Sequence, residues 1–295
     1  MKLAVTLTDQ ASLSKLLPYT DIFIIGLHGL THRMNTTFDL DTALSLMNEI
    51  KSHSKEVFIN LNRLYHDEDL TPLEDALKAL KDTGVDGILF ADLAVSEVAE
   101  SVDLKETLIY APETYLSHSL DVAFWEEENI KAVLLSKEMT LEDILSLKKH
   151  TDFPLGFVGH GYTNMFHSRR PLIENFFKHT KDLDPKALND KRNLTIVEEI
   201  RDEHYPIYQD SYGTHIFRAL PRESFSVLHE LSSTLDFMII DSILSKEEEI
   251  ITAVKDYSDA LKHGVNDDVL TKYKKTHDQG LLFKKTVLHK EGSDA

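Results

Sequence analysis

Cysteine is absent from this chain of 295 residues. The absence excludes disulfides, thiolate-bound zinc, iron–sulfur clusters held by cysteine, and catalysis by a cysteine nucleophile. Basic residues are also few, since 32 Lys and Arg stand against 50 Asp and Glu and give a formal net charge of -18. A chain with that charge repels phosphate backbones, so we expect no tight binding of nucleic acid by this chain alone.

Long apolar runs are lacking as well. The longest, Ile22 to Leu27, is far too short to cross a bilayer, and the first ten residues contain one basic side chain and a short apolar segment. We therefore expect a cytoplasmic protein without a signal peptide or membrane contact. The apolar fraction of 42% is ordinary for a globular protein, and the length suits one large domain over residues 1–295.

Short apolar runs alternate with helical stretches along the whole chain. Eight runs are rich in β-branched and aromatic residues, as parallel strands buried on both faces are. The runs are Leu3–Leu7, Asp21–Leu27, Glu56–Asn62, Asp86–Asp92, Thr107–Glu113, Ile130–Glu138, Leu155–Gly161 and Leu235–Ser242. This pattern predicts an α/β fold of the (β/α)8 TIM-barrel type. An open doubly wound sheet is the alternative, but no glycine-rich dinucleotide fingerprint follows the first run.

Local signals mark some helix ends. Thr71–Glu74 and Thr140–Asp143 have the composition of helix starts. Gly84 is expected to adopt the left-handed conformation after a helix that reaches Lys81.

One interval and the C-terminal tail depart from the alternation. Residues 162–234 separate the seventh and eighth runs by far more than one crossover needs, so we expect an insertion beside the barrel mouth. Within it, two β-like runs in Tyr205–Phe217 flank Asp210–Gly213 and predict a β-hairpin. The tail, about residues 264–295, contains a further strand-like run, Gly280–Lys290. That run packs either on its own barrel or on a partner.

Polar residues stand where the predicted strands end, which is where TIM barrels carry their active sites. The candidate catalytic residues are His160, Glu113, Asp92 and Glu138. The candidate substrate-binding residues are Asn60, Arg33, Lys137, Arg169 and Arg170. We expect the catalytic candidates and Asn60 to line one mouth and the cations to reach the same face. For Asp92 the equal alternative is a helix cap, and for the arginine pair it is a solvated surface turn.

These residue types point to acid–base chemistry and anion binding. A histidine can act as an acid, a base or a metal ligand near neutral pH, and two carboxylates can form an acid–base pair. Lys and Arg can hold a small anionic metabolite against the unfavourable net charge. The chain has 15 histidines, but none has a compact metal-ligand spacing, so we expect no metal and no other cofactor.

Several segments resemble peptidase family U32, the collagenase-like peptidases, over nearly the whole chain. The matching segments are Phe23–Leu27, Phe58–Leu70, Thr83–Asp92, Leu135–Ile144, Phe157–Gly161, Tyr205–Phe217 and Gly280–Thr286. The most specific are the His-Gly pair after the seventh run and the predicted hairpin.

Within that family the chain looks most like the short member of a paired set in Gram-positive bacteria. Those pairs are implicated in making 5-hydroxyuridine at the wobble position of tRNA, with prephenate as a required metabolite. The resemblance thus implies a subunit of tRNA hydroxylation that works with a longer, cysteine-containing paralogue and reaches tRNA only through that complex. Two alternatives stay open, a peptidase or other hydrolase and a non-catalytic barrel that binds a small acid.

The chain departs from the family where cysteine is expected. Members usually carry H-G-A-x-C-x-x-Y-S-G-x-C after the seventh strand, whereas this chain reads HGYTNMFHSRRPL. Asn164 and Pro171 occupy the two cysteine positions, and Ser168-Arg169 replaces the Ser-Gly pair. In redox-active relatives these cysteines hold an iron–sulfur cluster, which this chain cannot bind in that way. The peptidase label also lacks a nucleophile, metal motif or acid dyad in the sequence.

Overall fold

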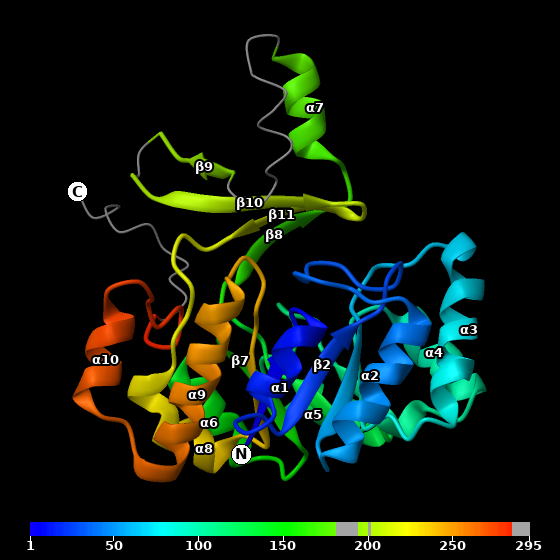
Figure 1. The fold of residues 1–295 in the computed structure, drawn as a ribbon, viewed down its shortest axis with the longest axis horizontal. Helices are drawn as coiled ribbons and strands as arrows, with labels where there is room; N and C mark the ends of the chain where they lie inside the picture. Colours follow the sequence, from blue (N-terminus) through cyan, green and yellow to red (C-terminus); the bar gives the residue numbers. More distant parts are fainter. Residues whose placement is uncertain (181–193, 200–201, 285–295) are drawn as a thin grey trace.

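The computed structural model describes residues 1–180, 194–199 and 202–284, and Figure 1 shows a barrel ringed by helices with a smaller sheet over one end. The barrel strands are β1 (Lys2–Thr6), β2 (Ile22–Gly26), β3 (Glu56–Leu61), β4 (Gly87–Phe90), β5 (Leu108–Tyr110), β6 (Ala132–Leu134), β7 (Leu155–His160) and β12 (Phe237–Ile240). They pair in parallel and close in the order β1-β12-β7-β6-β5-β4-β3-β2. The predicted (β/α)8 barrel is confirmed, and each strand lies inside its predicted run except β1, which begins one residue early at Lys2.

The strands are mainly apolar because each one serves two cores. In β2, Ile22 and Ile24 point into the barrel lumen, while Phe23 and Ile25 pack against the surrounding helices. Side chains alternate between the two faces of a strand, so burial of both faces favours apolar residues at successive positions, and polar residues stand mainly at the strand ends.

Helices cover the outside of the barrel. They are α1 (Leu13–Leu16), α2 (Leu40–Ser52), α3 (Leu70–Lys81), α4 (Leu93–Ser101), α5 (Ser119–Glu127), α6 (Leu141–Lys148), α8 (Leu228–Thr234), α9 (Glu247–His263) and α10 (Asp267–Lys274). A further helix, α7 (Leu172–His179), projects from the smaller sheet, away from the barrel (Figure 1). Of the helices in the part of the chain that is described, none is long and apolar enough to cross a membrane.

The structure confirms some of the predicted helix ends and contradicts one. Thr140 and Asp143 form a reciprocal capping box at the start of α6. Gly84 has a φ of 66° after α3, as expected. The predicted start at Thr71 is wrong, because α3 already begins at Leu70 after a 3-10 turn whose Asp69 carboxylate accepts a hydrogen bond from the His66 N–H.

The insertion forms a sheet of four strands. They are β8 (Asn164–Ser168), β9 (Thr195–Val197), β10 (His204–Asp210) and β11 (Gly213–Phe217). The predicted hairpin is confirmed as β10 and β11, and β8 and β9 extend it to the order β8-β11-β10-β9. The interval also includes α8, an ordinary barrel helix. Residues 181–193, most of a charged stretch that the sequence shows from His179 to Asn193, lie outside the described residues. In Figure 1 this sheet lies over the end of the barrel that bears the candidate site.

The start of the C-terminal tail packs on its own barrel. Residues 280–283 form a turn rather than the predicted strand, and residues 285–290 lie outside the described residues. Leu282 is buried, and its carbonyl accepts a hydrogen bond from the Leu141 N–H at 2.9 Å. This contact attaches the tail to the start of α6, which favours the first of the two alternatives for this part of the run.

Candidate functional site

A pocket lies at the carboxyl ends of the barrel strands, beneath the four-stranded sheet. Its apolar floor is made of lumen side chains, Ile24, Leu89, Leu134, Val158 and Ile239. Its polar wall includes Thr6, Arg33, Asn60, Asn62, Glu113, Lys137, Tyr162 and Asp241. Asn164 and Phe217 of the sheet close the other side. An apolar cavity with a few convergent polar groups is the usual form of a small-molecule site.

Glu113 stands between two cations in this pocket. One carboxylate oxygen pairs with the Arg33 guanidinium, and the other lies 3.1 Å from the Lys137 Nζ. Glu113 and Arg33 both have positive φ angles, 69° and 53°, in the left-handed region that non-glycine residues rarely adopt. Such conformations cost on the order of 1 kcal/mol each and concentrate at functional sites. When Lys137 is protonated, Arg33 and Lys137 carry one positive charge more than Glu113, and this excess attracts an incoming anion. Asp241 also lines the pocket and opposes the attraction when it is ionised.

Lys137 is the titratable cation of the pocket. Its side chain is buried, and this burial, together with the nearby Arg33 charge, lowers the pKa of Lys137 to about 7. Burial likewise lowers the pKa of Arg33 to about 10, while Asp241 and Asp210 oppose that shift. Arg33 therefore stays charged at neutral pH, whereas Lys137 exchanges its proton there.

Arg222 holds the backbone of Lys137 in place. This arginine is among the largest fully buried side chains, with 1% of its surface exposed. It donates hydrogen bonds to the carbonyls of Val158 at 3.0 Å and Lys137 at 2.5 Å, and its guanidinium lies over the Phe157 ring. The contacts tie β7 to the loop that carries Lys137. Sequence reasoning missed Arg222, since nothing around it marks it as buried.

Four of the nine predicted site residues meet in the pocket, namely Arg33, Asn60, Glu113 and Lys137. Asp92 instead caps α4, because its carboxylate accepts hydrogen bonds from Ala94 N at 3.0 Å and Tyr65 N at 2.9 Å. Glu138 is exposed beside the pocket and does not line it. The expectation that both acids line the mouth is corrected, and the capping alternative for Asp92 holds.

His160 lies on the other side of β7. Its buried ring packs against Tyr257, Tyr273 and the stacked ring of His277, at centroid distances of 5.5, 5.6 and 4.9 Å. The inward side chain of this strand end is Val158, and pairing with β12 shifts by one residue at Ile240. The placement of His160 at the mouth is therefore corrected. Burial lowers the pKa of His160 to about 3, so the ring is neutral at pH 7.

The arginine pair lies on the sheet and outside the pocket. Arg169 and Arg170 are both exposed, and an Arg169 nitrogen lies 3.5 Å from the His66 ring. Of the four cations expected to reach one face, Arg33 and Lys137 enter the pocket. Asp241, Asn62 and Tyr162 line it as well, and the first two do so because they follow strand ends.

Comparison with known proteins identifies relatives of this chain. The profile described as Peptidase family U32 matches residues 15–286. The chain is 26% identical over 268 residues to tRNA hydroxylation protein P2 of Bacillus subtilis (strain 168), a match that covers 88% of this chain and 85% of that protein. The tRNA hydroxylation protein P1 of the same organism is 30% identical over 125 residues, which cover 42% of this chain and 30% of that protein.

A solved structure supports the same assignment at the level of fold. The U32 peptidase Mk0906 superimposes with a TM-score of 0.51 and 14% identity, over 81% of this chain and 92% of that chain. Because the profile spans most of the sequence, the resemblance seen in the His-Gly pair and the hairpin is confirmed. The chain belongs to peptidase family U32.

Proposed function

We propose that this chain is a subunit of the machinery that hydroxylates uridine at the wobble position of tRNA to 5-hydroxyuridine. The observation that carries the proposal is the similarity to tRNA hydroxylation protein P2 over 88% of the chain. The match extends over 268 residues, which is the length of one barrel domain.

The chemistry assigns the redox step to a partner. Conversion of C5–H to C5–OH inserts one oxygen atom and removes two electrons from the base. This chain has no cysteine and so holds no cysteine-ligated iron–sulfur cluster. Two relatives of this chain, named P1 and P2, occur in one organism, which supports a partner from the same family. The partner in this proposal is a longer, cysteine-containing paralogue.

In this proposal the pocket binds a small carboxylic acid, with prephenate as the first candidate. A carboxylate can accept hydrogen bonds from the Arg33 guanidinium and the Lys137 ammonium, which now share Glu113. The Asn60 amide can donate a further hydrogen bond from the pocket wall. The apolar floor suits the ring of such an acid.

Deletion of the gene for this chain tests the proposal. Mass spectrometry of tRNA nucleosides should show loss of 5-hydroxyuridine, and a plasmid copy of this chain should restore it. Unchanged 5-hydroxyuridine in a strain that lacks this gene and any functional duplicate of it would contradict the proposal. If this chain restored 5-hydroxyuridine in a strain lacking every paralogue, the proposal of a paralogous partner would be contradicted instead.

A second candidate is a barrel that binds a small acid without taking part in hydroxylation. The two cations around Glu113 favour it, because they suit an anion whatever the later chemistry is. Acid binding combined with unaltered tRNA nucleosides would identify this case. Within the described residues, no contact favours peptide hydrolysis. Glu113 is paired with two cations and contacts no side chain that could serve as a nucleophile.

A further inference from the structure

We propose that His32, His167 and His215 bind a divalent transition-metal ion and thereby fasten the four-stranded sheet to the barrel mouth. The inference goes beyond the proposed function, and its test does not depend on hydroxylation. It also revises the expectation of no metal site, because the three histidines are far apart in sequence and only the fold brings them together.

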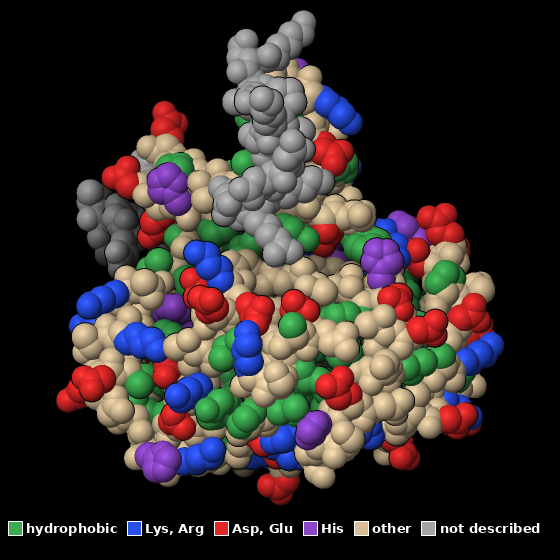
Figure 2. Space-filling view, in the orientation of Figure 1, with side chains coloured by type: hydrophobic (Ala, Val, Ile, Leu, Met, Phe, Trp, Pro, Cys, Tyr) green, Lys and Arg blue, Asp and Glu red, His purple; other side chains and the backbone are tan. Residues whose placement is uncertain are grey.

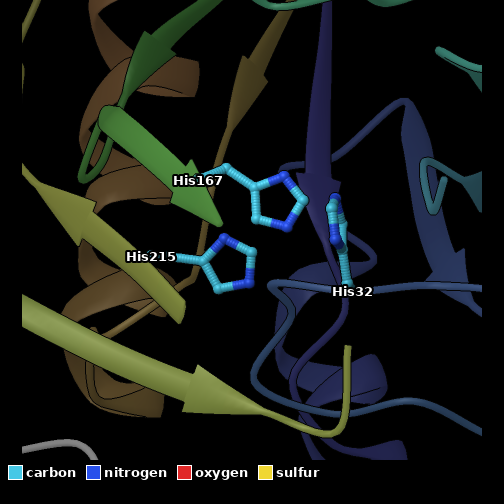
Figure 3. Close-up of side chains that lie close together, drawn as sticks. All are labelled: His32, His167 and His215. Carbon is cyan, nitrogen blue, oxygen red and sulfur yellow. The ribbon is translucent and has the colours of Figure 1, made fainter. Parts of the chain in front are cut away.

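The three imidazoles come from three segments and face one another (Figure 3). His167 of β8 and His215 of β11 are direct partners across the antiparallel pair, so their side chains share one face of the sheet. Their rings stack with centroids 4.6 Å apart. His32, from the loop after β2, meets both rings edge-on at 4.9 and 5.1 Å. One ligand atom from each histidine lies within 4.8 Å of the other two.

The imidazoles have unpaired nitrogens where they meet. His32 Nδ1, His167 Nε2 and both ring nitrogens of His215 are buried without a hydrogen-bond partner among the described residues. His32 and His215 are 6% and 0% exposed. An unpaired buried polar group costs about 1–3 kcal/mol, so four such atoms in one cluster call for a ligand. A metal ion accepts lone pairs from several of them at once.

The buried rings favour the form that binds metal. Burial disfavours a charged imidazolium, and a neutral imidazole offers one lone pair to an ion. Transition-metal–imidazole bonds are about 2.0–2.1 Å long, so binding requires the rings to move together by roughly an ångström. His167 is partly exposed and has room for that rotation.

The carboxylate of Asp210 lies beside the histidine cluster. Asp210 Oδ2 lies 3.6 Å from His215 Nε2, and the two carboxylate oxygens accept hydrogen bonds from Tyr212 N at 2.8 Å and Arg33 N at 3.1 Å. Carboxylates in this position orient a metal-bound histidine or supply a fourth ligand. The carboxylate is therefore held in place before an ion arrives.

The surrounding charges allow a dication. Arg33 and Arg63 lie near His32 and oppose a positive charge. Each is paired with a carboxylate, Arg33 with Glu113 and Arg63 with Asp69 at 2.8 Å. With Asp210 added, the three acidic side chains equal in number the cations Arg33, Arg63 and Lys137, so no net positive charge surrounds the ion.

The ligand set selects the class of metal. Three neutral imidazoles suit zinc, cobalt, nickel or copper, whereas magnesium and calcium prefer oxygen ligands. His32 and His167 also line a hollow that shares Arg33, Glu113 and Lys137 with the candidate pocket, so an ion can enter from the mouth. Because His32 belongs to the barrel and the other two to the sheet, the bound ion would join these two parts.

The test uses the full chain, freed of metal with a chelator and then titrated with Zn²⁺ or Co²⁺. We expect one Zn²⁺ per chain, an upward shift of the thermal midpoint with added Zn²⁺, and visible Co²⁺ absorption bands of a four-coordinate site. His167→Ala should weaken binding by roughly a hundredfold or more, and it is chosen because its partly exposed ring is the least demanding for folding.

His28→Ala is the matched control, since His28 is an exposed histidine in the same loop as His32. It should bind Zn²⁺ as the parent chain does. Equal binding by the two variants would mean that surface histidines take up the metal, and it would overturn the proposal. Absence of a stoichiometric site in the parent chain would overturn it independently of how any variant folds.

Discussion

Among single residues, Lys137 determines how the candidate pocket responds to pH. Because burial and the Arg33 charge lower its pKa to about 7, Lys137 loses its positive charge above that pH. We expect the affinity for prephenate, measured by calorimetry, to be level below about pH 7 and to fall by up to about tenfold per pH unit above it.

Lys137→Arg is the control, because a guanidinium keeps its charge over this whole range. Its affinity should stay level up to about pH 9. An equal decline in the variant and in the parent chain would show that another group titrates.

Arg33 provides the permanent charge of the pocket. Arg33→Gln should lower the affinity for prephenate by roughly tenfold to a hundredfold, since a hydrogen bond to a charged group contributes about 1.5–3 kcal/mol. Arg169→Gln should change it less than about twofold, because Arg169 is exposed and outside the pocket. The reverse ranking in a titration of both variants would place the acid on the sheet rather than in the barrel.

The sequence predicts which residues stand at strand ends, but it does not predict which of them face the pocket. Glu113 and Asn60 follow from their positions at the carboxyl ends of runs, and both line the pocket. His160 has the same kind of position, and alternation from the inward Val158 would turn it inward too, but the register shift between β7 and β12 turns it toward α9 and α10. Which face a strand-end residue occupies depends on register, and a single sequence does not encode register locally.

At the scale of elements, the C-terminal tail packs against the barrel at Gly280, next to the Arg222 side chain. This glycine has a φ of 60°, and a Cβ at its position would lie 2.6 Å from the Nε of buried Arg222. Arg222 is fixed by two carbonyls and has little freedom to move. Gly280→Ala should therefore lower the free energy of unfolding by about 2–3 kcal/mol, as measured by urea denaturation.

Gly84→Ala separates backbone strain from this clash. Gly84 has a similar φ of 66°, but its Cβ would meet only the end of Lys51 at 3.7 Å. The expected loss is about 1 kcal/mol. If the two variants were equally stable, the contact of Gly280 with Arg222 would not hold the tail.

The strands of the barrel could be predicted from the sequence, whereas only part of the inserted sheet could be. Nearly continuous apolar runs mark the eight strands because burial on both faces favours apolar residues at most positions. The hairpin of β10 and β11 has a turn signal, whereas β9 is three exposed residues and β8 exposes Met165 and Phe166. Strands with exposed apolar residues lack the alternation that pattern reasoning uses.

For the whole molecule, charge predicts weak binding to RNA. The formal net charge is -18, and on the face in Figure 2 the Lys and Arg side chains are scattered among Asp and Glu. Counterion release requires clustered cations, so the isolated chain should bind tRNA with a Kd above about 1 µM at about 0.15 M salt. Filter binding measures this, and submicromolar affinity would contradict the assignment of tRNA contact to the partner.

The most direct test of the account joins the pocket to the proposed function. In a strain lacking this gene, 5-hydroxyuridine in tRNA is quantified after complementation with the parent chain, Arg33→Gln or Arg169→Gln, at matched protein levels. The account predicts full restoration by the parent chain and by Arg169→Gln, and a large deficit with Arg33→Gln. Equal restoration by all three would contradict the claim that the barrel-mouth pocket of this chain serves tRNA hydroxylation.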